Sequence, residues 1–178
     1  MISKSYEIQK NTFNFLKFNV FLLYGENNGL KKDIRESIKI VVSQQDANIE
    51  LLSLYENDII DNEENFYNSI YSGSLFSNKK IITINNGTDK IIKQINHIVD
   101  RYPENVFVII FSDILEKKSQ LRNFFEKNLK TLCIPCYLDN DKDLEIIANT
   151  ELKKNNITLS RESINLLIEK SNNDRSNL

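Results

Sequence analysis

The sequence predicts an α/β domain with a mostly parallel sheet flanked by helices, followed by the start of a small helical domain. Two observations lead to this fold class. Short continuous apolar runs recur along the chain, which is typical of strands buried on both faces of a parallel sheet. Segments with helical spacing of apolar residues lie between these runs, and this alternation indicates βαβ units.

The strands are expected first at residues 20–24, 81–84 and 106–111, where the apolar runs are unbroken. Residues 49–54 and 131–137 are weaker candidates for two further strands. Four helical segments, each with a stripe of apolar residues, are expected between the strands, and Thr88 is expected to be the N-cap of the third segment. These stripes fall within residues 30–42, 66–71, 91–102 and 121–129.

The pattern changes near residues 139–141. Two helical segments follow without a strand between them, one over residues 144–152 and one that begins near Ser160. We therefore expect an α/β domain over residues 1–139 and part of a small helical domain over residues 140–178. The second part is short for an independent domain, so the chain is expected to be truncated.

Composition describes a soluble globular protein. The 178 residues are 40% hydrophobic and 27% charged, and the formal net charge is -2. This charge provides no overall basic field for sequence-independent binding to nucleic acid. The sequence contains neither a membrane-spanning run nor an N-terminal signal core, so we expect a cytoplasmic protein without a membrane partner.

The most informative local feature is the loop that joins the first strand to the first helix. Nucleotide-binding folds place their phosphate loop at this position. A loop of the G-x-x-x-x-G-K-[ST] type aligned on Gly25 has Leu30 at the position of the second glycine. Lys31 is in place, but Lys32 occupies the position of the hydroxyl that ligates Mg²⁺. Gly25 and Gly29 thus mark either a degenerate phosphate loop or an ordinary strand-to-helix turn.

The acidic partner of such a loop is also out of place. The strand at residues 106–111 is followed by Ser112 and then Asp113, so that the carboxylate comes one residue late. The sequence therefore predicts neither catalytic residues nor ATP hydrolysis, whichever interpretation of the loop holds.

The two cysteines, the histidine and a short basic stretch are each interpreted as structural and not as functional residues. Cys133 and Cys136 have C-x-x-C spacing but lie in or beside an apolar strand, which favours two buried reduced cysteines over redox chemistry. Zinc would need more ligands than these and His97, the sole histidine, so no metal site is expected. His97 is interpreted as a helix-surface residue, and the basic stretch at residues 117–122 as a solvated face.

One segment after the second helical stripe combines bulky apolar and small polar residues, Ser72-Gly73-Ser74-Leu75-Phe76-Ser77. Taken alone, the pattern favours Leu75 and Phe76 as core residues that close over the sheet edge. The functional alternative is an exposed apolar plug that binds a partner.

From about residue 20 onward, the chain resembles the delta subunit of the bacterial DNA polymerase III clamp loader. No single segment carries the resemblance, which lies in the order and spacing of five segments. These are residues 21–26, 74–80, 115–122, 136–137 and 157–160.

The resemblance implies an AAA+-like domain with a degenerate P-loop that neither binds nor hydrolyses ATP, followed by a helical lid domain and a helical collar. Here the lid would be incomplete and the collar absent. The resemblance also implies that the protein binds and opens the sliding clamp (the beta subunit) through Leu75 and Phe76, flanked by Ser74 and Ser77. This role replaces the interpretation of Leu75 and Phe76 as core residues. Other implied partners are the delta-prime and gamma/tau subunits, with DNA reached through the assembled complex and no cofactor.

Two rival functions remain. An active P-loop ATPase or kinase-like nucleotide-binding protein would rely on Lys31, and nucleotide titration separates it from a clamp-binding subunit. A thiol redox domain would rely on Cys133 and Cys136, and its signature would be a shifted thiol pKa.

Overall fold

The computed structural model describes residues 17–44, 48–73, 77–172 and 174–178. Five strands form one sheet in the order β2-β3-β4-β1-β5, and every pairing between neighbours is parallel. The strands are β1 (Val20–Tyr24), β2 (Ile49–Tyr55), β3 (Lys79–Asn85), β4 (Val106–Ser112) and β5 (Thr131–Pro135). All five predicted strands are therefore present, in the predicted parallel arrangement.

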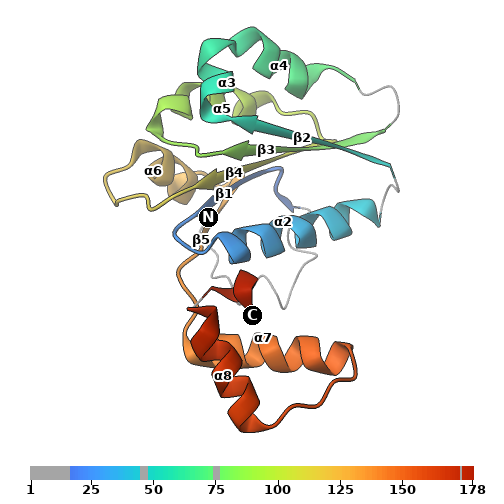
Figure 1. Ribbon diagram of the computed structural model, residues 1–178. Helices are drawn as coiled ribbons and strands as arrows, with labels where there is room; N and C mark the ends of the chain where they lie inside the picture. Colours follow the sequence, from blue (N-terminus) through green and yellow to red (C-terminus); the bar gives the residue numbers. More distant parts are fainter. Residues whose placement is uncertain (1–16, 45–47, 74–76, 173) are drawn as a thin grey trace.

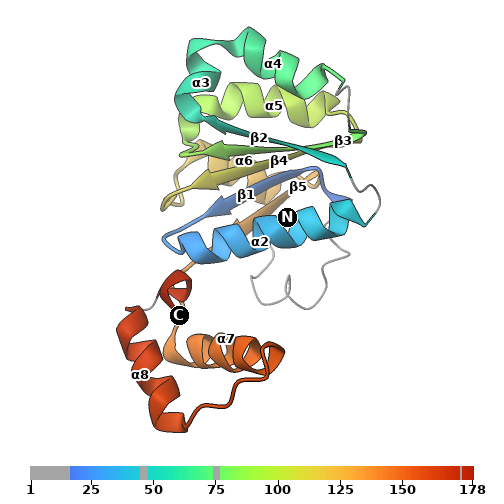
Figure 2. The same ribbon diagram turned by 45° about the vertical axis from the view of Figure 1, so that its right-hand side comes forward.

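Helices cover both faces of the sheet, as Figures 1 and 2 show. One face is covered by α2, and the other by α3, α4, α5 and α6. Beyond α2 lie α7 and α8, with a short 3-10 turn between them and the sheet domain (Figure 1). The helical elements are α2 (Asn28–Ser43), α3 (Glu56–Asp61), α4 (Glu63–Tyr71), η2 (Asp89–Ile91), α5 (Ile92–Arg101), α6 (Gln120–Lys127), α7 (Asp141–Lys154), α8 (Arg161–Ser171) and η3 (Arg175–Asn177).

The interior strand β1 lies between β4 and β5 and is buried along its whole length, which explains its unbroken apolar sequence. Because side chains alternate along a strand, Val20 and Leu22 pack against one set of helices, whereas Phe21 and Leu23 pack against α2. The sheet therefore has two apolar cores, one on each face. The fold class predicted from the sequence is confirmed.

Polar residues at the start of the helices explain where the helices begin. The side chains of Asn27, Asn62, Ser119, Asn140 and Ser160 each accept a hydrogen bond from a backbone N–H of the first turn. Each bond satisfies a donor that would otherwise have no partner within the helix. Thr88 does the same for η2, as its predicted role as an N-cap requires.

The helix pair α7–α8, called the lid below, has its own small core of Leu144, Ala148, Ile164 and Ile168. Leu178 packs against this core from the C-terminal side. The sheet ends at Pro135 and α7 begins at Asp141, so the change in element type falls where the sequence pattern changes. A domain limit at residues 139–140 remains a prediction.

Candidate functional site: a closed phosphate loop

The loop after β1 begins with a glycine that the backbone requires. Gly25 has a φ angle of +129°, which side-chain-bearing residues rarely adopt. A Cβ atom at this position would collide with the carbonyl oxygen of Cys136 and lie 2.8 Å from its carbonyl carbon. The N–H of Gly25 points toward the carbonyl oxygens of Ser112 and Asp113, each 3.2 Å away. The start of the loop is therefore locked between β4 and the segment after β5.

The backbone N–H groups that follow already have acceptors within the chain. The N–H of Asn27 donates to the carbonyl oxygen of Cys136 at 3.1 Å, and that of Leu30 donates to Oδ1 of Asn27 at 2.9 Å. The N–H groups of Asn28 and Lys31 also donate to main-chain oxygens of the loop. A phosphate loop works by pointing such groups at the ligand. Here they are used to close the turn.

The ammonium of Lys31 also donates its hydrogen bonds to oxygen atoms of the chain. The residue is only 2% exposed, and its ammonium donates to the carbonyl oxygen of Ser112 at 2.7 Å and to Oδ1 of Asn28 at 3.1 Å. Burial lowers the pKa of Lys31, and the carboxylate of Asp113 only partly offsets this shift. The ammonium therefore ties α2 to the end of β4.

The other loop positions hold side chains that face either the core or the solvent. Leu30 is buried in the core between α2 and the sheet, whereas Lys32 is exposed. Asp113 follows β4 immediately and is exposed, and its neighbour Ser112 donates its hydroxyl to the carbonyl oxygen of Gly87 at 2.6 Å. The structure thus places the Asp113 carboxylate near enough to the Lys31 ammonium to favour its charge.

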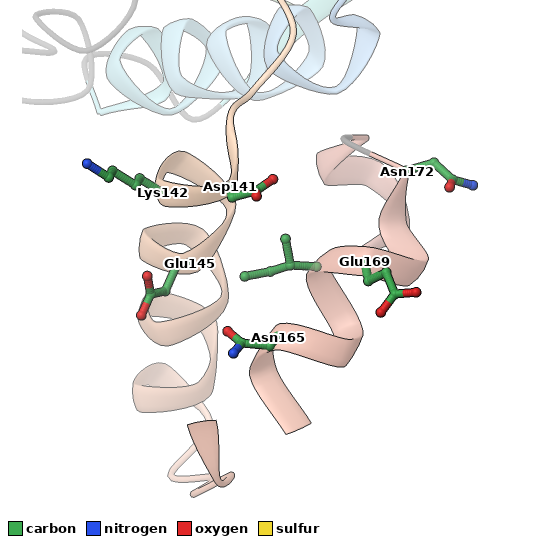
Figure 3. A pocket seen from close by; sticks show the side chains of 7 residues that line it. Asp141, Lys142, Glu145, Asn165, Glu169 and Asn172 are labelled. Atoms are coloured by element: carbon green, nitrogen blue, oxygen red, sulfur yellow. The ribbon is translucent and has the colours of Figure 1, made fainter. Parts of the chain in front are cut away.

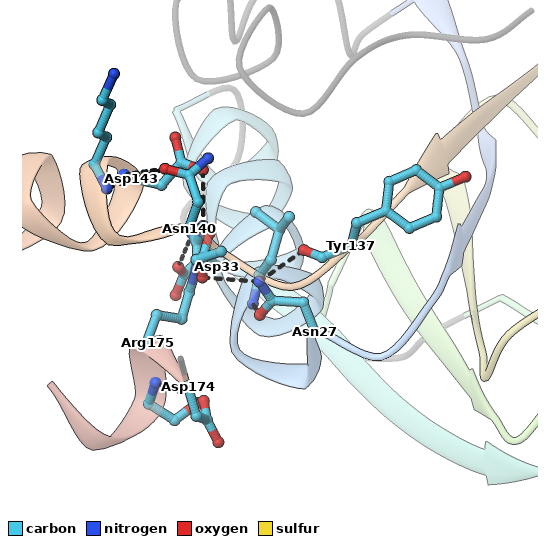
Figure 4. Close-up of polar contacts among 11 residues, drawn as sticks. Asn27, Asp33, Tyr137, Asn140, Asp143, Asp174 and Arg175 are labelled. Atoms are coloured by element: carbon cyan, nitrogen blue, oxygen red, sulfur yellow. Dashed lines mark hydrogen bonds and ion pairs between the residues drawn. The ribbon is translucent and has the colours of Figure 1, made fainter. Parts of the chain in front are cut away.

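Arg175 of η3 makes the main polar contact between the lid and the sheet domain (Figure 4). Its Nε donates to Oδ2 of Asp139 at 2.8 Å, and its Nη2 donates to Oδ1 of the same carboxylate. Its Nη1 donates to Oδ2 of Asp33 on α2 at 2.9 Å. Burial opposes the charge of Arg175, but its hydrogen bonds to the two carboxylates outweigh this effect and raise its pKa. Asn27 completes the network by donating to Asp139 at 2.8 Å.

The same turn fills the space above the first turn of α2. A Cβ atom at Gly29 would lie 2.5 Å from Cγ of Arg175 and 2.6 Å from Oγ of Ser176. Gly29 therefore lets the chain's own C-terminal turn approach the helix N-terminus, where a nucleotide-binding protein would place phosphate.

The predicted partner-binding pair, Leu75 and Phe76, lies outside the described residues, together with Ser74. The described chain reaches the end of α4 and Gly73 on one side and resumes at Ser77 on the other. The hydroxyl of Ser77 is buried and has no hydrogen-bond partner among the described residues. These residues remain candidates from the sequence.

The two cysteines are buried free thiols on opposite faces of the sheet. Burial raises the pKa of Cys133 and of Cys136 to about 12 in each case. A redox-active C-x-x-C pair needs a thiol pKa shifted in the opposite direction. His97 is exposed, as predicted, and its ring packs 5.0 Å from that of Tyr67.

A groove of about 690 Å³ is lined by residues of both lid helices (Figure 3). Its walls carry the carboxylates of Asp141, Glu145 and Glu169 and the ammonium of Lys142, with Ile168 between the helices. In the part of the chain that the structure covers, no group of three or more acidic, histidine or cysteine side chains converges to hold a metal ion.

Comparison with known proteins identifies the family. Residues 21–136 match the family described as DNA polymerase III, delta subunit, which is more than half of the chain. The chain belongs to the DNA polymerase III delta subunit family. The matched segment runs from β1 to the residue after β5 and therefore contains the closed loop.

Relatives and solved structures agree with this family. A probable DNA polymerase III subunit delta of Rickettsia prowazekii (strain Madrid E) is 27% identical over 153 residues, which are 85% of this chain and 44% of that protein. The Bacillus subtilis DNA clamp loader delta protein has a similar structure, with a TM-score of 0.61 and 13% identity over 92% of this chain and 51% of that one. The chain thus spans about half the length of these delta proteins.

A second solved structure has a similar fold. Domain III of the Thermotoga maritima replication initiation protein DnaA matches with a TM-score of 0.59 and 16% identity, over 97% of this chain and 77% of that one. Within the described ranges, no helix of this delta-family chain is long and apolar enough to cross a membrane.

Sequence reasoning missed Arg175, the residue that fills the loop from the outside. The last eight residues lack an apolar period, and no helix was expected there. The sequence carries no local signal for this role, because the contact joins Arg175 to Asp139, a buried carboxylate 36 residues away.

Proposed function

We propose that this chain is the clamp-binding part of a DNA polymerase III delta subunit that works without binding or hydrolysing ATP. The observation that carries the proposal is a delta-family sheet domain whose phosphate loop is filled by the chain's own groups. Lys31 donates to protein oxygens, and Arg175 and Ser176 cover Gly29. The domain then serves as a rigid mount and not as a nucleotide switch.

In this proposal, Leu75 and Phe76 insert into an apolar pocket of the sliding clamp, flanked by Ser74 and Ser77. A few bulky apolar residues commonly supply most of the binding free energy of such an interface. The sheet domain holds the pair in a pose that fits an opened clamp, so that binding free energy offsets the distortion of one clamp interface. ATP would act in neighbouring subunits, delta-prime and gamma/tau.

The rest of the proposed biology follows from this role. The chain is a non-catalytic subunit of the polymerase III holoenzyme, reaches DNA through the assembled loader, and acts in the cytoplasm, where replication takes place. Residues 1–139 form the AAA+-like domain, and residues 140–178 belong to the lid.

The test is a direct binding assay with the sliding clamp of the same organism. The double variant Leu75→Ala, Phe76→Ala should weaken clamp binding by about 30-fold or more, because loss of a hot spot costs about 2 kcal/mol or more. The matched control is Leu129→Ala, Ile114→Ala, which removes two other apolar side chains that are 85% and 63% exposed. This control should bind like wild type. Equal affinity of the Leu75/Phe76 variant and wild type would show that the site is wrongly assigned.

A second measurement addresses the nucleotide. The isolated chain should show no ATP turnover above buffer and no saturable binding of ATP with Mg²⁺. A Mg²⁺-dependent rate would overturn the non-catalytic part of the proposal and favour the ATPase alternative.

A further inference from the structure

Lys80 is a charged residue buried at the start of strand β3. It is 5% exposed, and it directly follows Lys79, where β3 begins. Burying an ammonium is costly unless oxygen atoms surround it. The position of Lys80 therefore needs a reason beyond the packing of the strand.

The ammonium of Lys80 caps the end of α4. Its Nζ donates to the carbonyl oxygen of Ser69 at 2.8 Å and to that of Ser72 at 3.2 Å. Helix α4 ends at Tyr71, so these carbonyls belong to its last turn and to its C-cap. A cation at this end also meets the negative end of the helix dipole. Glu50 on β2 lies 3.6 Å from the same nitrogen and balances its charge.

These contacts join the end of α4 to the start of β3, on either side of a short connecting segment. Ser72 is the last residue before the segment 73–78, and Lys80 lies just after it. The main chain of Lys80 is itself fixed, because its N–H donates to the carbonyl oxygen of Asn105 at 3.0 Å. One side chain therefore ties the two ends of the segment together. Ser77 does not share this task through its hydroxyl, which has no hydrogen-bond partner among the described residues.

We propose that Lys80 is a positioning residue for clamp binding, holding the ends of the segment that carries Leu75 and Phe76 at a fixed separation. This inference rests on the proposed function. A segment whose ends are fixed loses less conformational entropy when it binds, and preorganisation of this kind strengthens affinity without a new contact. Lys80 itself need not touch the clamp.

The test is the variant Lys80→Met, which keeps an apolar stem of similar length and removes the three polar contacts. Clamp affinity should fall about tenfold. The matched control is Lys90→Met, because Lys90 is a lysine with a 69% exposed side chain that pairs with Glu56 elsewhere on the domain. It carries the same change of charge and should leave clamp affinity unchanged.

A double-variant cycle separates positioning from general destabilisation. In the Leu75→Ala, Phe76→Ala background, Lys80→Met should have no further effect on residual clamp binding, because nothing remains to be positioned. Hydrogen exchange of the wild-type and Lys80→Met chains should differ at the amides of residues 70–80 while the other strands stay protected.

Each outcome has a distinct meaning. If the Leu75/Phe76 variant binds the clamp like wild type, the proposed function fails at its site, and the positioning role falls with it. If that variant loses binding but folded Lys80→Met keeps full affinity, the inference about Lys80 alone is wrong. Equal losses from Lys80→Met in both backgrounds would also contradict positioning and would indicate an effect of global stability.

Discussion

The contact of Arg175 with Asp139 gives the sharpest stability prediction. We consider Arg175→Met, which keeps a long apolar stem and removes the guanidinium. The side chains of Arg175 and Asp139 are 7% and 5% exposed, so the substitution leaves a buried carboxylate without its cation. Breaking a buried pair in this way costs about 3–5 kcal/mol. Asp139 keeps its bond from Asn27, which places the expected loss near the lower end, about 3 kcal/mol.

The contact with Asp33 adds little to this value. Asp33 is 57% exposed on its side chain, and pairs with a solvent-exposed partner contribute about 0–1 kcal/mol. For a chain of this size, 1 kcal/mol corresponds to about 2–4 °C in Tm, so the variant should melt about 6–12 °C below wild type.

The assay is thermal and urea unfolding followed by circular dichroism, with Arg35→Met as the matched control. Arg35 pairs with Glu36 in an exposed position, at 37% and 49% side-chain exposure, and its replacement should change stability by no more than about 0.5 kcal/mol. The double variant Arg175→Met, Asp139→Asn should recover part of the loss, because no uncompensated charge then remains. The reasoning is refuted if Arg175→Met is as stable as Arg35→Met, or if the two substitutions at the buried pair simply add.

Three further predictions concern other positions. Gly25→Ala should destabilise the fold by about 2–4 kcal/mol, because Gly25 has a positive φ angle and a Cβ atom there would collide with backbone atoms. The control is Gly73→Ala, whose Cβ atom would meet nothing within 4 Å and which should change stability by no more than about 0.5 kcal/mol. Urea unfolding of both variants measures the difference. For Asp89, burial opposes ionisation, but hydrogen bonds from the start of α6 outweigh it and lower its pKa. Its stabilisation is therefore present above the unfolded pKa and is lost as pH falls through the folded one. The stability gap between wild type and Asp89→Asn should be about 1 kcal/mol at neutral pH and shrink below about pH 4 in acid titrations, and a constant gap would argue against this. Cys133 and Cys136, with pKa values of about 12, should resist a thiol reagent at pH 8 until the chain is denatured, and rapid labelling of the native protein would contradict their burial.

The sheet was predictable from the sequence because its signal is local. Buried parallel strands are continuous apolar runs, so β1 and β4 could be recognised from a few neighbouring residues. The edge strand β2 gave a weaker signal because half-buried and exposed residues alternate along most of its length. The short helix α3 was not predicted, since only Ile59 among its apolar residues is buried and no apolar period can develop over six residues.

The differences between this loop and a working phosphate loop could be predicted from the sequence. The replacement of the second glycine and of the hydroxyl beside Lys31 could be identified residue by residue. The groups that fill the loop could not, because Arg175 reaches Asp33 across 142 residues and no local pattern encodes such a pair. The inward turn of Lys31 also depends on Ser112, a residue 81 positions away.

The central claim is that this delta-family chain binds the sliding clamp without using nucleotide. The most direct measurement is a calorimetric titration of the clamp with the wild-type chain, with and without ATP and Mg²⁺. We predict saturable binding with the same Kd under both conditions, because Lys31 and the N-terminus of α2 are already occupied within the chain. The absence of clamp binding, or a Kd that changes severalfold with ATP, would contradict the account.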